Sequence, residues 1–104
     1  MITLEIDTSN NKVTKLVLQL GDKKYESIKK YDTPKADAVL REIDILFKKT
    51  NTDKSKIDKI IVHRGPGSYT GIRVGLAIAN TLAFALRIPV NNRPPGEYET
   101  ALYK

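Results

Sequence analysis

The sequence contains no cysteine and no tryptophan, and His63 is its one histidine. Without cysteine, the chain has no disulfide, no thiolate nucleophile and no cysteine-bound metal. A lone histidine also excludes a metal site built on two histidines, so we predict no metal and a packing or hydrogen-bonding role for His63. With 104 residues, of which 40% are hydrophobic, the chain is long enough for one hydrophobic core but not for two.

Long hydrophobic runs are missing as well. Arg73, Asn80 and Arg87 lie seven residues apart and interrupt the most apolar segment, which we therefore expect to fall short of the roughly 18 residues of a membrane span. The amino terminus leads straight into strand sequence, without the pattern of a signal peptide. We expect a cytoplasmic protein that does not contact a membrane.

The net charge of +6 is the strongest bias in the composition. Many lysines fall in pairs on polar segments, at residues 23–24, 29–30 and 48–49, and no aromatic platform for bases accompanies them. Dispersed lysine is typical of solvated surface. The charge alone therefore does not predict direct nucleic-acid binding by this chain.

Three strands are predicted at the start of the chain. Apolar and polar residues alternate over residues 2–7, which is the period of a strand with one buried face. Residues 13–20 repeat this pattern, and Gly21-Asp22 provides a tight turn into a lysine-rich strand at 23–31, whose composition suits an exposed sheet edge. The three strands predict an antiparallel meander.

A helix and a fourth strand are predicted next. Thr33 is a suitable N-cap and Pro34 a suitable first helical residue, and apolar residues then recur at helical spacing as far as Lys48. The predicted buried face comprises Ala36, Val39, Leu40, Ile43, Leu46 and Phe47. After a polar loop at 50–56, residues 57–63 form a strand that is reached by a right-handed crossover.

The most informative stretch covers residues 60–90. Its apolar run at 60–62 is typical of a buried strand, and the Gly-Pro-Gly sequence at 65–67 ends that strand. A long helix over residues 69–86 then leads to a fifth strand at 88–91. The element order βββαβαβ predicts an α/β domain with a five-stranded mixed sheet.

The long helix carries Gly71, Gly75, Ala79 and Ala83 at every fourth position, a ridge that allows another helix to approach closely. Almost all its other positions are apolar, so contact with one sheet would leave hydrophobic surface in water. We predict that a second protein covers this helix; the alternative is that the ridge packs against the predicted helix at residues 34–48 of the same chain. The predicted partner interface comprises Gly71, Gly75, Ile78, Ala79, Leu82, Ala83 and Leu86.

The glycine-rich turn at 65–71 is a candidate anion site, because backbone N–H groups at a helix N-terminus attract anions. It is not a Walker loop, because Ile72-Arg73 stands where that motif needs Lys-Ser/Thr. A plainer interpretation is a turn whose glycines permit unusual backbone angles, with Asp7 capping a turn of its own. The candidate anion or nucleotide site comprises Asp7, Thr8, Gly65, Gly67, Ser68, Thr70, Gly71 and Arg73.

Residues 65–77 read GPGSYTGIRVGLA, Ile88-Pro89 follows the helix, and residues 6–9 read IDTS. These motifs resemble the TsaB-type subunit of the bacterial machinery that makes threonylcarbamoyladenosine in tRNA. The resemblance covers residues 1–91 and implies a ribonuclease-H-like half domain of the actin and Hsp70 type. Beyond it, residues 92–104 are predicted to form a short helix or a disordered tail.

The resemblance implies a non-catalytic scaffold subunit, without a cofactor or a catalytic residue of its own. Its helices would dock and activate a TsaD-like catalytic partner, together with a small TsaE-like ATPase, and tRNA would be bound only through that complex. Alone, the chain is expected to form a homodimer through its long helices. The alternative is a small nucleotide-binding protein or hydrolase that uses Asp7 and the GPGSYTG loop, although the spacing identifies no base for Ser68.

Overall fold

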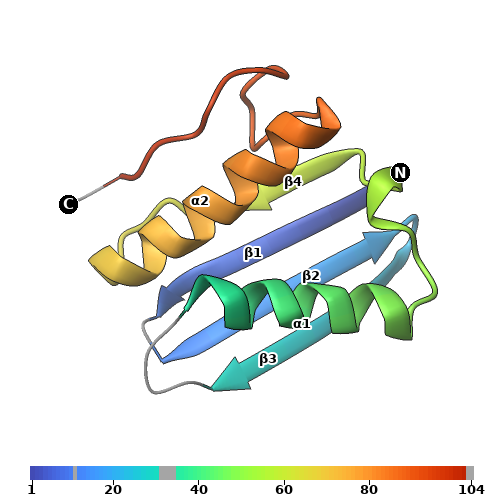
Figure 1. The fold of residues 1–104 in the computed structure, drawn as a ribbon, viewed down its shortest axis with the longest axis horizontal. Helices are drawn as coiled ribbons and strands as arrows, with labels where there is room; N and C mark the ends of the chain where they lie inside the picture. Colours follow the sequence, from blue (N-terminus) through green and yellow to red (C-terminus); the bar gives the residue numbers. More distant parts are fainter. Residues whose placement is uncertain (11, 31–34, 103–104) are drawn as a thin grey trace.

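A computed structural model describes residues 1–10, 12–30 and 35–102, and it shows one sheet with two helices on the same face (Figure 1). The strands are β1 (Ile2–Asn10), β2 (Val13–Leu20), β3 (Lys23–Lys30) and β4 (Lys59–Val62), in the sheet order β3-β2-β1-β4. The helices are α1 (Ala36–Lys49) and α2 (Tyr69–Leu86), and a short 3-10 helix, η1 (Lys54–Lys56), lies between α1 and β4. The predicted α/β class is confirmed.

The sheet is mixed, as the sequence predicts. β1, β2 and β3 pair antiparallel, with Ile6 opposite Leu16 and Leu18 opposite Tyr25. β4 pairs parallel to the central strand β1, with Val62 opposite Ile6. Because side chains alternate along a strand, the buried residues of β1 point toward the helices while their neighbours point to the opposite face.

The predicted fifth strand is wrong in the described part of the chain. Residues 88–91 contribute only an isolated parallel bridge between Ile60 and Val90. The Ile60 N–H donates to Pro89 O at 3.1 Å and the Asn91 N–H donates to Ile60 O at 2.8 Å, and then the backbone pairing stops. The reason is that the Asn91 side chain, rather than further backbone, bonds to Val62.

Helix α1 follows the predicted periodicity but begins later than predicted. Its N-cap is Lys35, whose side chain forms no capping hydrogen bond, and Thr33 and Pro34 lie outside the described residues. Val39, Ile43, Leu46 and Phe47 are buried as predicted. Ala36 and Leu40, assigned to the same buried face, are exposed.

A continuous hydrophobic core lies between the sheet and the two helices. Its fully buried members include residues from every element that contacts it: Leu4, Ile6, Leu16, Leu18, Val39, Ile60 and Ile72. Burying each such side chain contributes about 1.5–3 kcal/mol to folding. The lysine-rich strand β3 contributes little to this core, which agrees with its position at the sheet edge.

The segment after α2 folds back along β4 and α2, as Figure 1 shows in the red end of the trace. Residues 97–102 form no helix, contrary to one of the two predicted states, and residues 103–104 lie outside the description. The Leu102 N–H donates to Arg64 O at 2.8 Å, beyond the end of β4. This segment therefore lies beside the outer edge of β4.

Helix α2 is long and apolar enough to cross a membrane by length and composition alone, with 18 residues and a mean hydropathy of 1.3. The prediction that Arg73, Asn80 and Arg87 shorten the apolar run below that length is therefore wrong, because the 18 residues from Tyr69 to Leu86 meet it. In the structure the inner side of α2 packs on the sheet, with Ile72 and Ala79 completely buried. Core packing accounts for this hydropathy equally well.

Candidate functional site

The loop between β4 and α2 lies on the end of β1. The Ser68 N–H donates to Ser9 O at 2.7 Å. Gly67 has a φ of +159° and Gly65 a φ of +121°, and a Cβ at Gly67 would overlap Ser9. The glycines are needed for this close approach, because a side chain at either position would push the loop away from its neighbours.

The first turn of α2 is capped by Ser68, whose Oγ accepts a hydrogen bond from the Gly71 N–H at 3.1 Å. On β1, the buried Thr8 hydroxyl donates to Gly71 O at 2.5 Å. A Cβ at Gly71 would overlap Thr8 O, and a Cβ at Gly75 would overlap Thr8 Oγ1. The glycine ridge of α2 thus brings the helix backbone into contact with a strand.

This packing corrects the predicted partner interface. Gly71, Gly75, Ile78, Ala79 and Ala83 are buried within the chain and are not available to a second protein in this structure. The remaining two predicted interface residues, Leu82 and Leu86, are partly buried against the core. The spacing of small residues did indicate a close approach, but the neighbour is β1.

The predicted anion-site residues divide between the two faces of β1. Thr8 points toward α2, whereas Asp7 lies on the opposite face, where its Oδ1 accepts hydrogen bonds from the Ser9 N–H at 3.0 Å and the Ser9 hydroxyl at 2.6 Å. Asp7 therefore caps its own turn. Its other oxygen lies 3.5 Å from Nδ1 of His63.

His63 follows β4 and lies beside two carboxylates of β1. Its Nε2 is 2.8 Å from Glu5 Oε2, and the side chain is 42% exposed. This contact agrees with the predicted hydrogen-bonding role. Among the described residues, no group of three or more histidine or acidic side chains is arranged to hold a metal ion.

Arg73 and Thr70, both on α2, complete the predicted set. The Arg73 guanidinium donates to the Tyr69 hydroxyl at 2.8 Å and lies 5.2 Å from the centre of the Tyr69 ring, a cation–π contact on the exposed side of α2. Thr70 is exposed in the first helical turn. The structure thus joins Thr8, Gly67, Ser68 and Gly71 as packing contacts, while anion binding stays a prediction.

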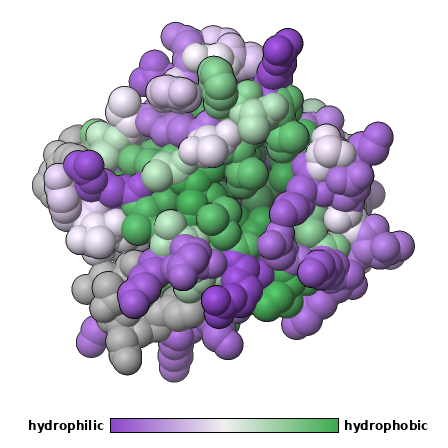
Figure 2. Space-filling model, in the orientation of Figure 1, coloured by the Kyte–Doolittle hydropathy of each residue, from purple (hydrophilic) through white to green (hydrophobic). Residues whose placement is uncertain are grey.

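Hydrophobic surface gathers along α2 and between α2 and α1, on the face of the molecule opposite the open side of the sheet (Figure 2). Leu40 of α1 is 43% exposed and Phe84 of α2 is 60% exposed. Val74, Leu82 and Leu86 of α2 are partly buried and pack against the core. We call this exposed apolar surface of α1 and α2, which includes Leu40 and Phe84, the helical face. Exposed apolar patches often mark interaction sites.

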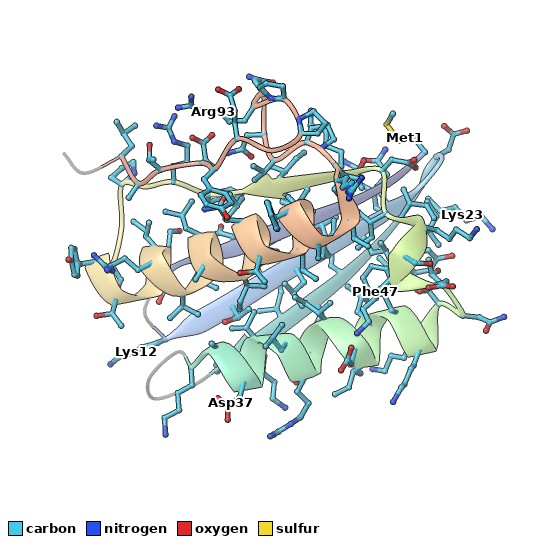
Figure 3. The ribbon with its side chains drawn as sticks, turned by 45° about the horizontal axis from the view of Figure 1, so that its top comes forward. Met1, Lys12, Lys23, Asp37, Phe47 and Arg93 are labelled. Atoms are coloured by element: carbon cyan, nitrogen blue, oxygen red, sulfur yellow. The ribbon has the colours of Figure 1, made fainter. Side chains whose placement is uncertain are left out.

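A second cluster, which the sequence did not indicate, surrounds Glu99. This residue is only 6% exposed, and Figure 3 labels its neighbour Arg93 on the segment that follows α2. Burial by itself would raise the pKa of Glu99, but hydrogen bonds from Asn91 and the Thr100 N–H, with Arg64 and Arg93 nearby, outweigh burial and lower that pKa. Glu99 is therefore held as a carboxylate.

No periodic pattern could have revealed this cluster, because its members come from three separate places in the chain. Arg64 follows β4, Asn80 lies on α2, and Asn91 and Arg93 come after the helix. The one available signal was Asn80, a polar residue on an otherwise apolar helix. A polar group at such a position needs a hydrogen-bonding partner when it is partly buried.

Comparison with known proteins places this fold and these motifs in a family. The model of the family described as TsaD, tRNA N6-adenosine threonylcarbamoyltransferase, matches residues 34–92. This match covers more than half of the chain, so the chain belongs to that family. A tRNA N6-adenosine threonylcarbamoyltransferase from Nitrosomonas eutropha is 41% identical over 54 residues, which is 52% of this chain and 16% of that protein.

Within the family the chain is of the TsaB type. The tRNA threonylcarbamoyladenosine biosynthesis protein TsaB of Bacillus subtilis is 33% identical over 91 residues, covering 88% of this chain and 40% of that protein. The TsaB of Haemophilus influenzae is 34% identical over 89 residues, covering 84% of this chain and 36% of that protein. The chain spans about two fifths of the length of these relatives.

Solved structures agree with this assignment. YeaZ from Pseudomonas aeruginosa superposes with a TM-score of 0.81 at 28% identity, over 86% of this chain and 42% of that chain. The sheet and its two helices therefore have the YeaZ fold.

Proposed function

We propose that the chain is a non-catalytic scaffold subunit in the biosynthesis of threonylcarbamoyladenosine in tRNA. It docks a TsaD-like catalytic partner through the helical face and holds that partner in its active shape. The observation that carries this proposal is the exposed apolar surface over α1 and α2, in a chain whose relatives are TsaB proteins. Exposed apolar patches of this kind mark protein interfaces.

Docking through the helical face is compatible with the packing of α2. Its inner side is fixed on the sheet by Thr8, so a partner can bind the outer side without disturbing the core. Leu40 and Phe84 become buried on binding, and each buried side chain of this size contributes about 1.5–3 kcal/mol before the costs of association.

Further parts of the proposal concern the assembly. Without its partner, the chain pairs with a second copy through the same helical face, and light scattering at high micromolar concentration tests this homodimer. A small TsaE-like ATPase joins the complex, tRNA is bound only through the complex, and the assembly is cytoplasmic. These statements are supported by the resemblance to TsaB proteins and by the absence of an aromatic base platform.

The test compares two exposed apolar residues on opposite faces of the molecule. Leu40→Arg, on the helical face, should weaken binding to a TsaD-like protein at least about tenfold, because the new charge must be desolvated at the interface. Ile28→Arg is the control, since Ile28 is 60% exposed on β3 and, by pairing with Lys15, lies on the open face of the sheet. Equal binding by both variants would overturn docking through the helical face.

The alternative, a small nucleotide-binding protein or hydrolase, makes a different prediction. It requires Asp7 and the loop at 65–71 to bind a nucleotide, whereas one Asp7 oxygen already accepts two hydrogen bonds from Ser9. Calorimetric titration with ATP and magnesium separates the two functions. Only the alternative predicts a Kd below about 0.1 mM, equivalent to roughly 5.5 kcal/mol.

A further inference from the structure

The C-terminal segment, residues 97–102, lies on the chain in the manner of a bound peptide. Asn80 of α2 contacts the backbone of Glu99 twice: its Nδ2 donates to Glu99 O at 2.9 Å, and its Oδ1 accepts from the Glu99 N–H at 2.8 Å. This pair of bonds fixes an extended backbone without depending on its side chain. It is the kind of main-chain contact by which proteins hold peptide strands.

The side chain of Glu99 is recognised separately. Its Oε1 lies 3.3 Å from Arg64 Nε and 3.4 Å from Arg93 Nε, and its Oε2 accepts from Asn91 Nδ2 at 2.9 Å. The Arg64 Nε–H donates to Thr100 O at 2.8 Å, so Arg64 is an ion-pair partner of Glu99, whereas Arg93 donates a charge-assisted hydrogen bond to it. These two charges favour a carboxylate over an amide. Asn80, Arg64, Asn91 and Arg93, which we call the receptor groups, thus bind both the backbone and the charged side chain of Glu99.

Asn91 links this receptor to the sheet. Its side-chain oxygen accepts from the Val62 N–H at 2.9 Å and its side-chain nitrogen donates to Val62 O at 3.1 Å, so it occupies the edge of β4. Among the receptor groups, Asn80 lies on α2, Arg64 follows β4 directly, and Asn91 is bonded to the edge of β4, so three of the four are placed by regular elements. On either side of Glu99, the segment that these groups hold is exposed: Tyr98 is 59% and Leu102 38% exposed.

We propose that Arg64, Asn80, Asn91 and Arg93 form a binding site for an extended acidic peptide segment of a partner protein, which residues 97–102 fill in this structure. The occupant seen here shows the required chemistry: a glutamate, with an aromatic residue before it that packs on Phe84 at a ring distance of 6.1 Å. The chain's own segment then competes with the partner for this site.

Charge complementarity favours an acidic partner. A pocket of about 720 Å³ lies beside the site, and its lining includes Lys59, Arg64 and Arg93 against the single acid Glu99. The chain as a whole carries a net charge of +6. Once Glu99 leaves, these cations lose their counter-charge, so a carboxylate from another protein takes its place.

The experiment uses a labelled synthetic peptide with the sequence of residues 96–102 and measures its fluorescence anisotropy against the full chain. The Glu99→Ala chain should bind the peptide at least about tenfold more tightly than the wild-type chain, because its own segment no longer competes. Glu97→Ala is the matched control, since Glu97 is an exposed acid two residues earlier, and this variant should behave as the wild type does. A peptide carrying Glu99→Gln should bind the Glu99→Ala chain about tenfold more weakly.

Three results would overturn the proposal. The first is a folded Glu99→Ala chain that binds no peptide, and the second is equal binding of the glutamate and glutamine peptides. The third is a wild-type dimer that the peptide dissociates, which would make a second copy's segment the occupant. If circular dichroism shows that Glu99→Ala is unfolded, Tyr98→Ala replaces it, because this variant loosens the segment at Phe84 and leaves the cations in place.

Discussion

The inner and outer sides of α2 are both rich in apolar residues, but the inner side is tightly packed on the sheet and the outer side is exposed. On the inner side, Gly71 and Gly75 have no room for even a Cβ, because Thr8 occupies that space. On the outer side, Ala77 and Phe84 are exposed, and no described element covers them apart from the contact between Phe84 and Tyr98. Small residues on the inner side therefore serve the fold, whereas those on the outer side are free to serve an interface.

The largest expected difference in stability is between two arginine substitutions, one at an alanine on each side of α2. Ala79 is completely buried, so Ala79→Arg places an unpaired charge in the core and should destabilise the fold by about 4 kcal/mol or more. Ala77 is exposed, and Ala77→Arg should change stability by no more than about 0.5 kcal/mol. Thermal melting followed by circular dichroism measures both.

The same two variants also test the proposed docking. Ala77→Arg should remain folded and bind a TsaD-like protein at least about tenfold more weakly, because the long charged side chain stands on the helical face. A stable Ala79→Arg chain would show that the inner side of α2 is not held on the sheet. Normal binding by Ala77→Arg would limit the interface to other parts of that face.

A smaller effect is expected where the helix touches β1. Gly75→Ala would ordinarily stabilise a helix by about 1 kcal/mol. Here the added methyl group overlaps Thr8 Oγ1, and overpacking of this kind costs about 1–3 kcal/mol. We expect a net loss of stability in denaturant unfolding.

A double-mutant cycle identifies the cause of that loss. Thr8→Ala removes the hydroxyl that the new methyl group meets, together with its hydrogen bond to Gly71 O. The two changes should therefore be less destabilising together than the sum of the single variants, by about 1 kcal/mol or more. Additive losses would mean that Thr8 does not limit the approach of α2.

The sequence predicted the parts of this fold that depend on local patterns. Alternation gave β1 and β2, the Gly21-Asp22 turn gave the hairpin, and helical spacing gave both helices. The spacing of glycines in α2 also revealed a close approach. It could not reveal the neighbour, because a ridge of small residues fits a strand bearing a small side chain as well as it fits another helix.

Long-range polar contacts were outside the reach of sequence patterns. Asn91 bonds to Val62 across 29 residues and replaces the backbone of the predicted fifth strand. Glu99 is held by residues that no periodicity groups together. In both cases a side chain forms hydrogen bonds or an ion pair with a residue far away in the sequence. Local helix and strand propensities do not indicate which distant residue that partner is.

An intermediate effect of acid is expected at Glu99. The pKa of Glu99 is lowered in the folded chain from its ordinary value of 4.5. The ionised carboxylate therefore stabilises the fold fully at a pH above about 4.5, and this stabilisation is lost as the pH falls through the lower pKa of the folded chain. At neutral pH, Glu99→Gln should be less stable than wild type by about 1–2 kcal/mol. Denaturant unfolding from pH 7 to pH 3 measures the difference, which should shrink on acidification. A constant difference would mean that the charge of Glu99 is not what holds the segment.

The smallest effect is expected at Asp7, and the chain provides an internal control for it. Asp7 and Asp53 each accept hydrogen bonds from the backbone N–H and the hydroxyl of the serine two residues later. If Asp7 only caps its turn, Asp7→Ala should cost about 1 kcal/mol or less, and Asp53→Ala should likewise change the melting temperature little. Both should then leave partner-dependent threonylcarbamoyl transfer within about tenfold of wild type, or 1.4 kcal/mol.

The comparison between these two aspartates separates a turn from a binding site. Both carboxylates make the same local bonds, but Asp7 alone lies beside His63, at 3.5 Å, and on the strand whose end contacts the glycine-rich loop. A loss of activity in a folded Asp7→Ala chain, with Asp53→Ala unaffected, would therefore arise from this location and would favour the nucleotide-binding alternative. Equal, small effects on melting temperature and on activity would leave Asp7 with the structural role that its hydrogen bonds to Ser9 already explain.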